Sequence, residues 1–141
     1  MAVLTELVLA NPQEAEAVGK ASVPIRQWEG LDAKGHNEIT LGTLLAILRG
    51  EQITDDTFLD CPCLYEGSQE GPWVYALPQE LADAILGLEE ARLGDVVNQW
   101  CDTEELEELP PDQARDFLRA LKALFVAAQE RGKSVLMWTS L

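Results

Sequence analysis

One stretch decides the fold of this chain: residues 111–141, which read PDQARDFLRALKALFVAAQERGKSVLMWTSL. Its apolar side chains recur every three or four residues, so they share one side of a helix with about 3.6 residues per turn: Ala114, Phe117, Leu118, Leu121, Leu124, Phe125 and Ala128. Pro111 suits the first helical turn, where its missing N–H has no helical partner, and Gly132 marks a helix end. We therefore predict an amphipathic helix from Pro111 to Arg131 that lies on a sheet.

The residues after Gly132 predict a strand of that sheet, over residues 134–141. They form a short apolar run behind a glycine turn, which is typical of an inner strand: Val135, Leu136, Met137 and Trp138. Residues 3–10 are apolar except for Thr5 and Glu6 and predict a second strand. Residues 73–77 have an alternating side-chain pattern and are bounded by two prolines, Pro72 and Pro78. They predict a short strand at the sheet edge.

Helix signals separate these strands. Asn11 and Glu14 open a short helix ending near Gly19, with Asn11 as the cap and Glu14 placed to reach back to it. Further helices are expected over residues 38–49, 78–86 and 88–100, whereas residues 51–71 have little periodicity and are the most loop-like part of the chain. The pattern predicts one α+β or α/β domain over residues 1–141, with a small sheet covered by amphipathic helices.

Charge limits the possible partners. The chain is 47% hydrophobic and 25% charged, as expected for a globular protein, but it carries a net charge of −15. Residues 61–111 hold twelve acidic side chains and one basic side chain, whereas residues 112–141 hold three acidic and five basic ones. Such an acidic chain is repelled by phosphate backbones and by anionic membranes, so neither is expected as a partner.

The expected cellular compartment is inferred from the membrane and secretion signals that the sequence lacks. We find no apolar run of the roughly 18 residues that a membrane span requires, and no secretion signal opens the chain. The three cysteines, Cys61, Cys63 and Cys101, are an odd number and do not indicate a disulfide framework. A reducing compartment agrees with this, and we expect the protein in the cytoplasm.

The order of these segments resembles that of the YfbM-like family of uncharacterised bacterial proteins. The matching pieces are Trp28 with Leu31 and Asp32, the leucine-rich residues 41–50, Leu77-Pro78 with Glu80, and residues 117–137. The resemblance implies an α/β-type fold and leaves the activity unknown.

His36 is the only histidine and the main candidate for catalysis. With Asp32 or Glu38 to orient it, His36 could act as a general base near neutral pH. The alternative is a solvated loop histidine beside the next helix, which we favour because no recognised motif links His36 to a nucleophile. A small hydrolase or transferase is therefore the second functional hypothesis.

A bound metal or cofactor is not expected. Cys61 and Cys63 could supply two thiolates, but the usual C-x-x-C spacing and a second Cys/His pair are missing. Ordinary loop or buried thiols are the simpler interpretation. The glycine motifs that bind phosphates do not occur either.

The leading hypothesis is a non-enzymatic protein-interaction module. The densest acidic cluster, which could attract a basic protein, consists of Asp102, Glu104, Glu105, Glu107 and Glu108. Trp28 and Trp73 lie beside loops and could anchor such a partner, whereas Trp100 and Trp138 are expected in the core with their indole N–H groups bonded. An immunity or inhibitor-type binder is one form of this function. Plain packing of Trp28 and Trp73, and a solvated first helical turn for the acidic cluster, are the alternatives.

Overall fold

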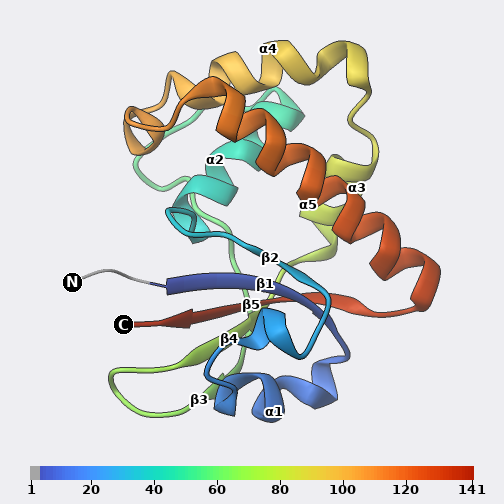
Figure 1. The fold of residues 1–141 in the computed structure, drawn as a ribbon. Helices are drawn as coiled ribbons and strands as arrows, with labels where there is room; N and C mark the ends of the chain where they lie inside the picture. Colours follow the sequence, from blue (N-terminus) through green and yellow to red (C-terminus); the bar gives the residue numbers. More distant parts are fainter. Residues whose placement is uncertain (1–3) are drawn as a thin grey trace.

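The protein forms one antiparallel sheet with helices on both faces (Figure 1), in a computed structural model that describes residues 4–141. Its five strands lie in the order β2-β1-β5-β4-β3. The strands are β1 (Leu4–Ala10), β2 (Gly30–Asp32), β3 (Cys63–Glu66), β4 (Trp73–Ala76) and β5 (Ser134–Ser140). The helices are α1 (Ala15–Lys20), α2 (Glu38–Arg49), α3 (Gln79–Leu86), α4 (Glu90–Cys101) and α5 (Pro111–Arg131), with short 3₁₀ turns η1 (Pro12–Glu14), η2 (Pro24–Arg26) and η3 (Glu104–Leu106). The predicted α+β fold is confirmed.

The centre of the sheet joins the two ends of the chain. β1 and β5 pair antiparallel along their full lengths, from Leu4 opposite Ser140 to Ala10 opposite Ser134. Both strands are buried on both faces at their centres, which explains their nearly continuous apolar sequence. Val3, the first residue of the strand expected over residues 3–10, lies outside the described residues.

Helices α2, α3, α4 and α5 lie on one side of the sheet and form the larger core, in which α4 packs on α2 and α5 and lies farthest from the strands (Figure 1). All seven apolar residues predicted for the inner side of α5 are buried. Pro111 is in its first turn, and Gly132 follows its last residue with φ at +63°, a left-handed conformation that glycine adopts without strain. The predictions for α5 and for α2 are confirmed at both ends of each helix.

The opposite face carries a smaller core beneath α1 and η2. Val8, Leu136 and Trp138 from the central strands pack there with Val18 of α1. The backbone N–H of Asn11 donates a hydrogen bond of 2.9 Å to Glu14 Oε1, as the predicted helix opening requires. This arrangement gives the sheet a thin layer on one side and a thick helical layer on the other.

Two expectations about the sheet are wrong. The segment expected at the edge, β4, lies inside the sheet between β5 and β3, because Pro72 and Pro78 fall just outside it and leave its hydrogen-bond ladder intact. The sheet also has two short strands that we did not expect, β2 and β3. β3 falls within the residues expected to be a loop, and its pairing with β4 shifts register between Cys63 and Tyr65.

Candidate functional site

A groove of about 560 Å³ at the amino-terminal end of α2 combines exposed apolar and acidic side chains. Three separate segments form it: the first turns of α2, the loop of residues 53–58 and the η3 turn. We call it the acidic groove. Its lining consists of Glu38, Ile39, Thr43, Ile53, Thr54, Asp55, Thr57, Phe58, Thr103, Glu104 and Glu105.

A helix cap fixes the α2 side of the acidic groove. Asn37 Oδ1 accepts hydrogen bonds from the backbone N–H groups of Ile39, at 2.9 Å, and Thr40, at 3.0 Å. Glu38, the first helical residue, is favoured there because the amino-terminal end of a helix attracts negative charge. Ile39 is held on the outer side of this turn with 41% of its surface exposed.

Backbone contacts fix the loop side. The N–H of Leu59 donates a hydrogen bond of 2.8 Å to the carbonyl oxygen of Glu38, and the Leu59 side chain is buried. Gly42 of α2 allows this close approach, because a Cβ there would lie 2.6 Å from both the Leu59 nitrogen and the Phe58 carbonyl carbon. Phe58 is thereby held outward with 61% of its surface exposed.

The third side comes from the acidic segment after α4. Thr103 Oγ1 donates a hydrogen bond of 2.6 Å to the carbonyl oxygen of Trp100, and Leu106 is buried at the other end of the turn. Glu104 and Glu105 lie between these two anchors and are exposed. Glu104 and Glu105 are therefore solvated in the first turn of a short 3₁₀ helix behind α4, which agrees with the alternative of a solvated first helical turn, and α5 begins only at Pro111.

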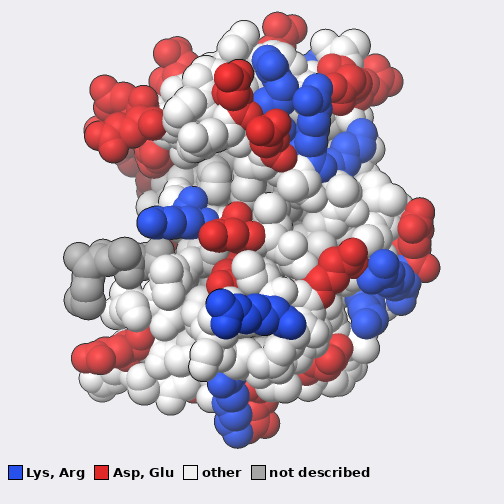
Figure 2. Space-filling view, viewed as in Figure 1, with Lys and Arg blue, Asp and Glu red and all other residues white. Residues whose placement is uncertain are grey.

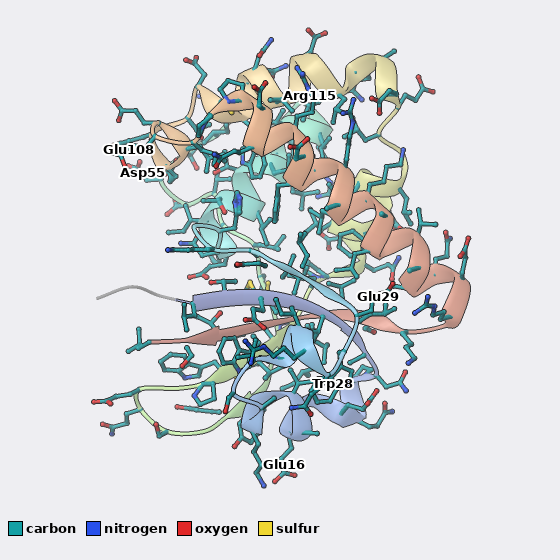
Figure 3. The ribbon with its side chains drawn as sticks, in the orientation of Figure 1. Glu16, Trp28, Glu29, Asp55, Glu108 and Arg115 are labelled. Atoms are coloured by element: carbon teal, nitrogen blue, oxygen red, sulfur yellow. The ribbon has the colours of Figure 1, made fainter. Side chains whose placement is uncertain are left out.

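Negative charge dominates the acidic groove. Four of its lining residues are carboxylates, Glu38, Asp55, Glu104 and Glu105, and none is lysine or arginine. Figure 2 shows acidic side chains gathered at the upper left of the molecule, where Figure 3 labels Asp55 and Glu108. Basic side chains gather farther to the right, around Arg115. A cationic partner is therefore attracted to the groove end of the protein.

A smaller hollow of about 260 Å³ adjoins the acidic groove, and we call it the Tyr75 hollow. The two share Glu38 and Phe58. The other lining residues of the Tyr75 hollow are Leu59, Asp60, Cys61, Tyr75 and Met137. Burial chiefly, together with the charges of Glu38 and Asp60, raises the pKa of the Cys61 thiol to about 12.

His36 lies in the core. Its side chain is 5% exposed, and its ring stacks on Phe117 at 4.0 Å and on Trp100 at 5.1 Å between ring centroids. Its Nδ1 lies 3.3 Å from Thr40 Oγ1, and burial lowers the pKa of His36 to about 4. The expectation of a solvated loop histidine is therefore wrong.

The carboxylates expected to orient His36 are engaged elsewhere. Asp32 Oδ1 accepts a hydrogen bond of 3.0 Å from the backbone N–H of Lys34, and Glu38 lines the acidic groove. Within residues 4–141, the hydrogen-bond partner of the His36 ring is the Thr40 hydroxyl. The structure therefore does not assemble the catalytic site that the second hypothesis requires.

The cysteines are free thiols at different depths. Cys63 is exposed, whereas Cys61 and Cys101 are half-buried. Across the described part of the chain, no group of three or more His, Cys, Asp or Glu side chains is arranged to hold a metal ion.

The structure brings together only part of the expected partner-binding set. Glu104 and Glu105 line the acidic groove. Asp102 caps the end of α4, and Glu107 and Glu108 are exposed beside the groove.

The two aromatic candidates lie elsewhere. Trp28 is half-buried on the other face of the sheet, where its indole N–H donates a hydrogen bond of 3.1 Å to Glu14 Oε2 (Figure 3). Trp73 is half-buried in β4. Neither tryptophan is among the residues that line the acidic groove.

The residues that sequence analysis missed are the apolar ones of the groove. Ile39 lies in the helix predicted over residues 38–49, and 41% of its surface is exposed. Ile53 is an isolated apolar residue in a polar, acidic loop, and Phe58 forms an apolar pair with Leu59 in the same loop; these apolar residues among polar ones are the signal that could have drawn attention to them.

Comparison with known proteins gives no match: no family model matches the chain, and no curated protein or solved structure is significantly similar to it. The resemblance to the YfbM-like family stays a prediction. In the described residues, no helix is both long enough and apolar enough to span a membrane.

Proposed function

We propose that this protein is a non-enzymatic interaction module of the cytoplasm that binds a basic protein through the acidic groove. An immunity or inhibitor-type binder of a basic protein is one form that this function takes. One observation carries the proposal: three exposed large apolar side chains, Ile39, Ile53 and Phe58, line the same groove as four carboxylates.

This composition suits a protein interface. Binding energy is usually concentrated in a few apolar side chains at the centre of an interface, with polar and charged groups around them. Ile53 and Phe58 supply such a centre, and the glutamates of η3 supply part of the charged surround. Charges of one sign attract an oppositely charged partner and raise its association rate, an effect that salt weakens.

The hypothesis of a hydrolase or transferase has no comparable support. His36, its central residue, is 5% exposed and packed against two aromatic rings. A general base must come within hydrogen-bond reach of its substrate, which this location does not permit without opening the core.

The test is a capture experiment with matched variants. The immobilised protein is exposed to a cell lysate at about 50 mM and about 300 mM salt, and captured proteins are quantified by mass spectrometry. The groove variant is Glu104→Gln/Glu105→Gln, and the control is Glu107→Gln/Glu108→Gln, which removes the same charge from the same segment outside the groove lining. A third variant, Ile53→Ala, removes an exposed apolar side chain of the groove.

We expect at least one basic protein that the wild type and the control capture and that the groove variant captures about threefold less at low salt. Ile53→Ala should weaken the same interaction at both salt concentrations. Direct binding of the purified partner then verifies the contact. The proposal is wrong if no basic protein is captured, or if both double variants reduce capture equally.

A further inference from the structure

We propose that the Tyr75 hollow is an arginine-binding site, which receives one arginine side chain of the protein bound in the acidic groove. This inference rests on the proposed function and names the chemistry of the partner. It comes from the lining of the hollow, which combines two aromatic rings, Phe58 and Tyr75, with two carboxylates, Glu38 and Asp60.

The size of the Tyr75 hollow fits a side chain. Its volume of about 260 Å³ lies below the roughly 300 to 1,000 Å³ that is usual for small-molecule sites. Its floor is apolar, since Leu59 and Met137 are buried there, and its carboxylates are exposed. An occupant therefore needs an apolar stem and a polar head at the mouth, as a long basic side chain has.

The rings and carboxylates favour arginine over other basic groups. A guanidinium is planar, stacks on aromatic faces and binds carboxylates with two parallel hydrogen bonds. Lysine offers a compact ammonium that is more strongly hydrated and therefore harder to strip of water. Phe58, 61% exposed, is the ring most accessible to an incoming group.

The charges of the carboxylates in and near the hollow make a smaller contribution in the same direction. The pKa of the Cys61 thiol is raised to about 12, by burial first and then by the charges of Glu38 and Asp60. The pKa of Tyr75 is also raised, chiefly by burial, with Glu38 and Glu66 contributing. Burial, the largest cause in both groups, disfavours any charge, whereas the smaller contributions of Glu38, Asp60 and Glu66 come from a negative field that stabilises a cation. Cys61 remains a neutral thiol and serves as part of the wall.

The hollow and the groove are placed to act together. Glu38 and Phe58 line both, so an occupant of one lies beside an occupant of the other. A segment of the partner that presents a large apolar side chain next to an arginine would fill both sites. The apolar residue would contact Ile53 and Phe58, and the arginine would contact Asp60 and Tyr75.

The test is a titration of the ¹⁵N-labelled protein, followed by NMR, with N-acetyl-arginine methylamide. The neutral probe of similar shape is N-acetyl-citrulline methylamide, and the lysine analogue is the third probe. We expect saturable shifts at Cys61, Tyr75 and Met137 with the arginine probe, and affinity about tenfold weaker for citrulline because it lacks the charge. The lysine probe should bind more weakly than the arginine probe.

The variant Asp60→Asn should weaken arginine binding about threefold or more, whereas Asp56→Asn, an exposed acid of the same loop outside this hollow, should leave it unchanged. The groove variant Glu104→Gln/Glu105→Gln should also keep its affinity for the arginine probe, because these residues do not line the Tyr75 hollow. The two proposals can therefore fail separately.

Several results would overturn the inference. They are equal binding of arginine and citrulline, shifts that fall outside the hollow, tighter binding of the lysine probe, or an unchanged affinity in Asp60→Asn. Free arginine that binds more than tenfold tighter than the blocked form would indicate a site for a small molecule. That result would exclude the side chain of a partner as the natural occupant.

Discussion

The backbone N–H of Leu59 donates a hydrogen bond to the carbonyl oxygen of Glu38 over 2.8 Å. This bond ties the loop after α2 to the first turn of the same helix, so Phe58 is exposed beside Glu38. The acidic groove and the Tyr75 hollow share Glu38 and Phe58, so this attachment helps to shape both.

The first prediction concerns Gly42, where the loop approaches α2. Gly42→Ala would place a Cβ 2.6 Å from the backbone of Phe58 and Leu59, so one of the two segments must move. We expect a loss of about 1 to 3 kcal/mol in the free energy of unfolding, measured by urea denaturation. Basic partners should also bind more weakly.

The matched control for this change is Gly94→Ala in α4. A Cβ at Gly94 meets open space, so the alanine should stabilise the helix by about 0.5 to 1 kcal/mol. If Gly42→Ala were as stable as the wild type, the close packing of the loop against α2 would not hold the groove in shape.

The second prediction is a pH dependence due to His36. Burial lowers its pKa to about 4, whereas an unfolded histidine titrates near about 6.5. Between these values the unfolded state binds the proton and the folded state does not, so the free energy of unfolding falls as the pH falls. Below about pH 4 both states are protonated and this contribution to the decline ends.

The variant His36→Phe isolates this effect, because it keeps a ring beside Trp100 and Phe117 but cannot titrate. Between pH 7 and pH 4.5, the wild type should lose about 2 kcal/mol more of its unfolding free energy than the variant does. Urea denaturation at both pH values measures the difference. Parallel declines in the two proteins would mean that His36 is accessible to protons in the folded state.

The third prediction compares two buried tryptophans. The indole N–H of Trp100 donates a hydrogen bond of 2.9 Å to the carbonyl oxygen of Thr40, whereas that of Trp138 is buried without a partner within the described residues. The expectation of a bonded indole is thus confirmed for Trp100 and wrong for Trp138. Both side chains lie in the core, as expected, at 0% and 3% exposure.

Replacement by phenylalanine removes a hydrogen bond at Trp100 and an unsatisfied donor at Trp138. We therefore expect Trp100→Phe to destabilise the protein by about 1 kcal/mol more than Trp138→Phe does, beyond the similar loss of packing in each. Thermal and urea denaturation of the two variants give this comparison. Equal destabilisation would indicate that the indole N–H of Trp138 has a hydrogen-bond partner in solution.

The fourth prediction concerns the reactivity of the thiols. With its pKa raised to about 12, Cys61 is a thiolate in a fraction on the order of 10⁻⁴ of molecules at pH 8. Cys63 is exposed, so iodoacetamide should modify it first and Cys61 at least about 100-fold more slowly. Peptide mass spectrometry over time measures both rates, and the urea-unfolded protein, in which all three thiols should react alike, is the control.

Local signals in the sequence were enough to predict the long elements. The apolar period and the flanking Pro111 and Gly132 predicted α5, and α2 was predicted over its full range, because helices depend on neighbours three or four residues away. The short strands had no such signal. β2 has three residues and β3 four, and each is a strand only because a distant segment pairs with it.

The candidate site was only partly predictable for the same reason. The acidic run that contains Glu104 and Glu105 was evident from composition, but its neighbours Ile53 and Phe58 come from a distant loop. The core position of His36 depends on its stacking with Trp100 and Phe117, which belong to two later helices.

By itself, the sequence determined an acidic protein with a sheet, a long carboxyl-terminal helix and a final inner strand, since these follow from charge and from local periodicity. Only the tertiary structure decided where the acidic residues meet exposed apolar ones, and only it placed His36 in the core. The physical reason is that burial and electrostatic fields depend on distance in space, and the chain folds so that residues remote in sequence come into contact.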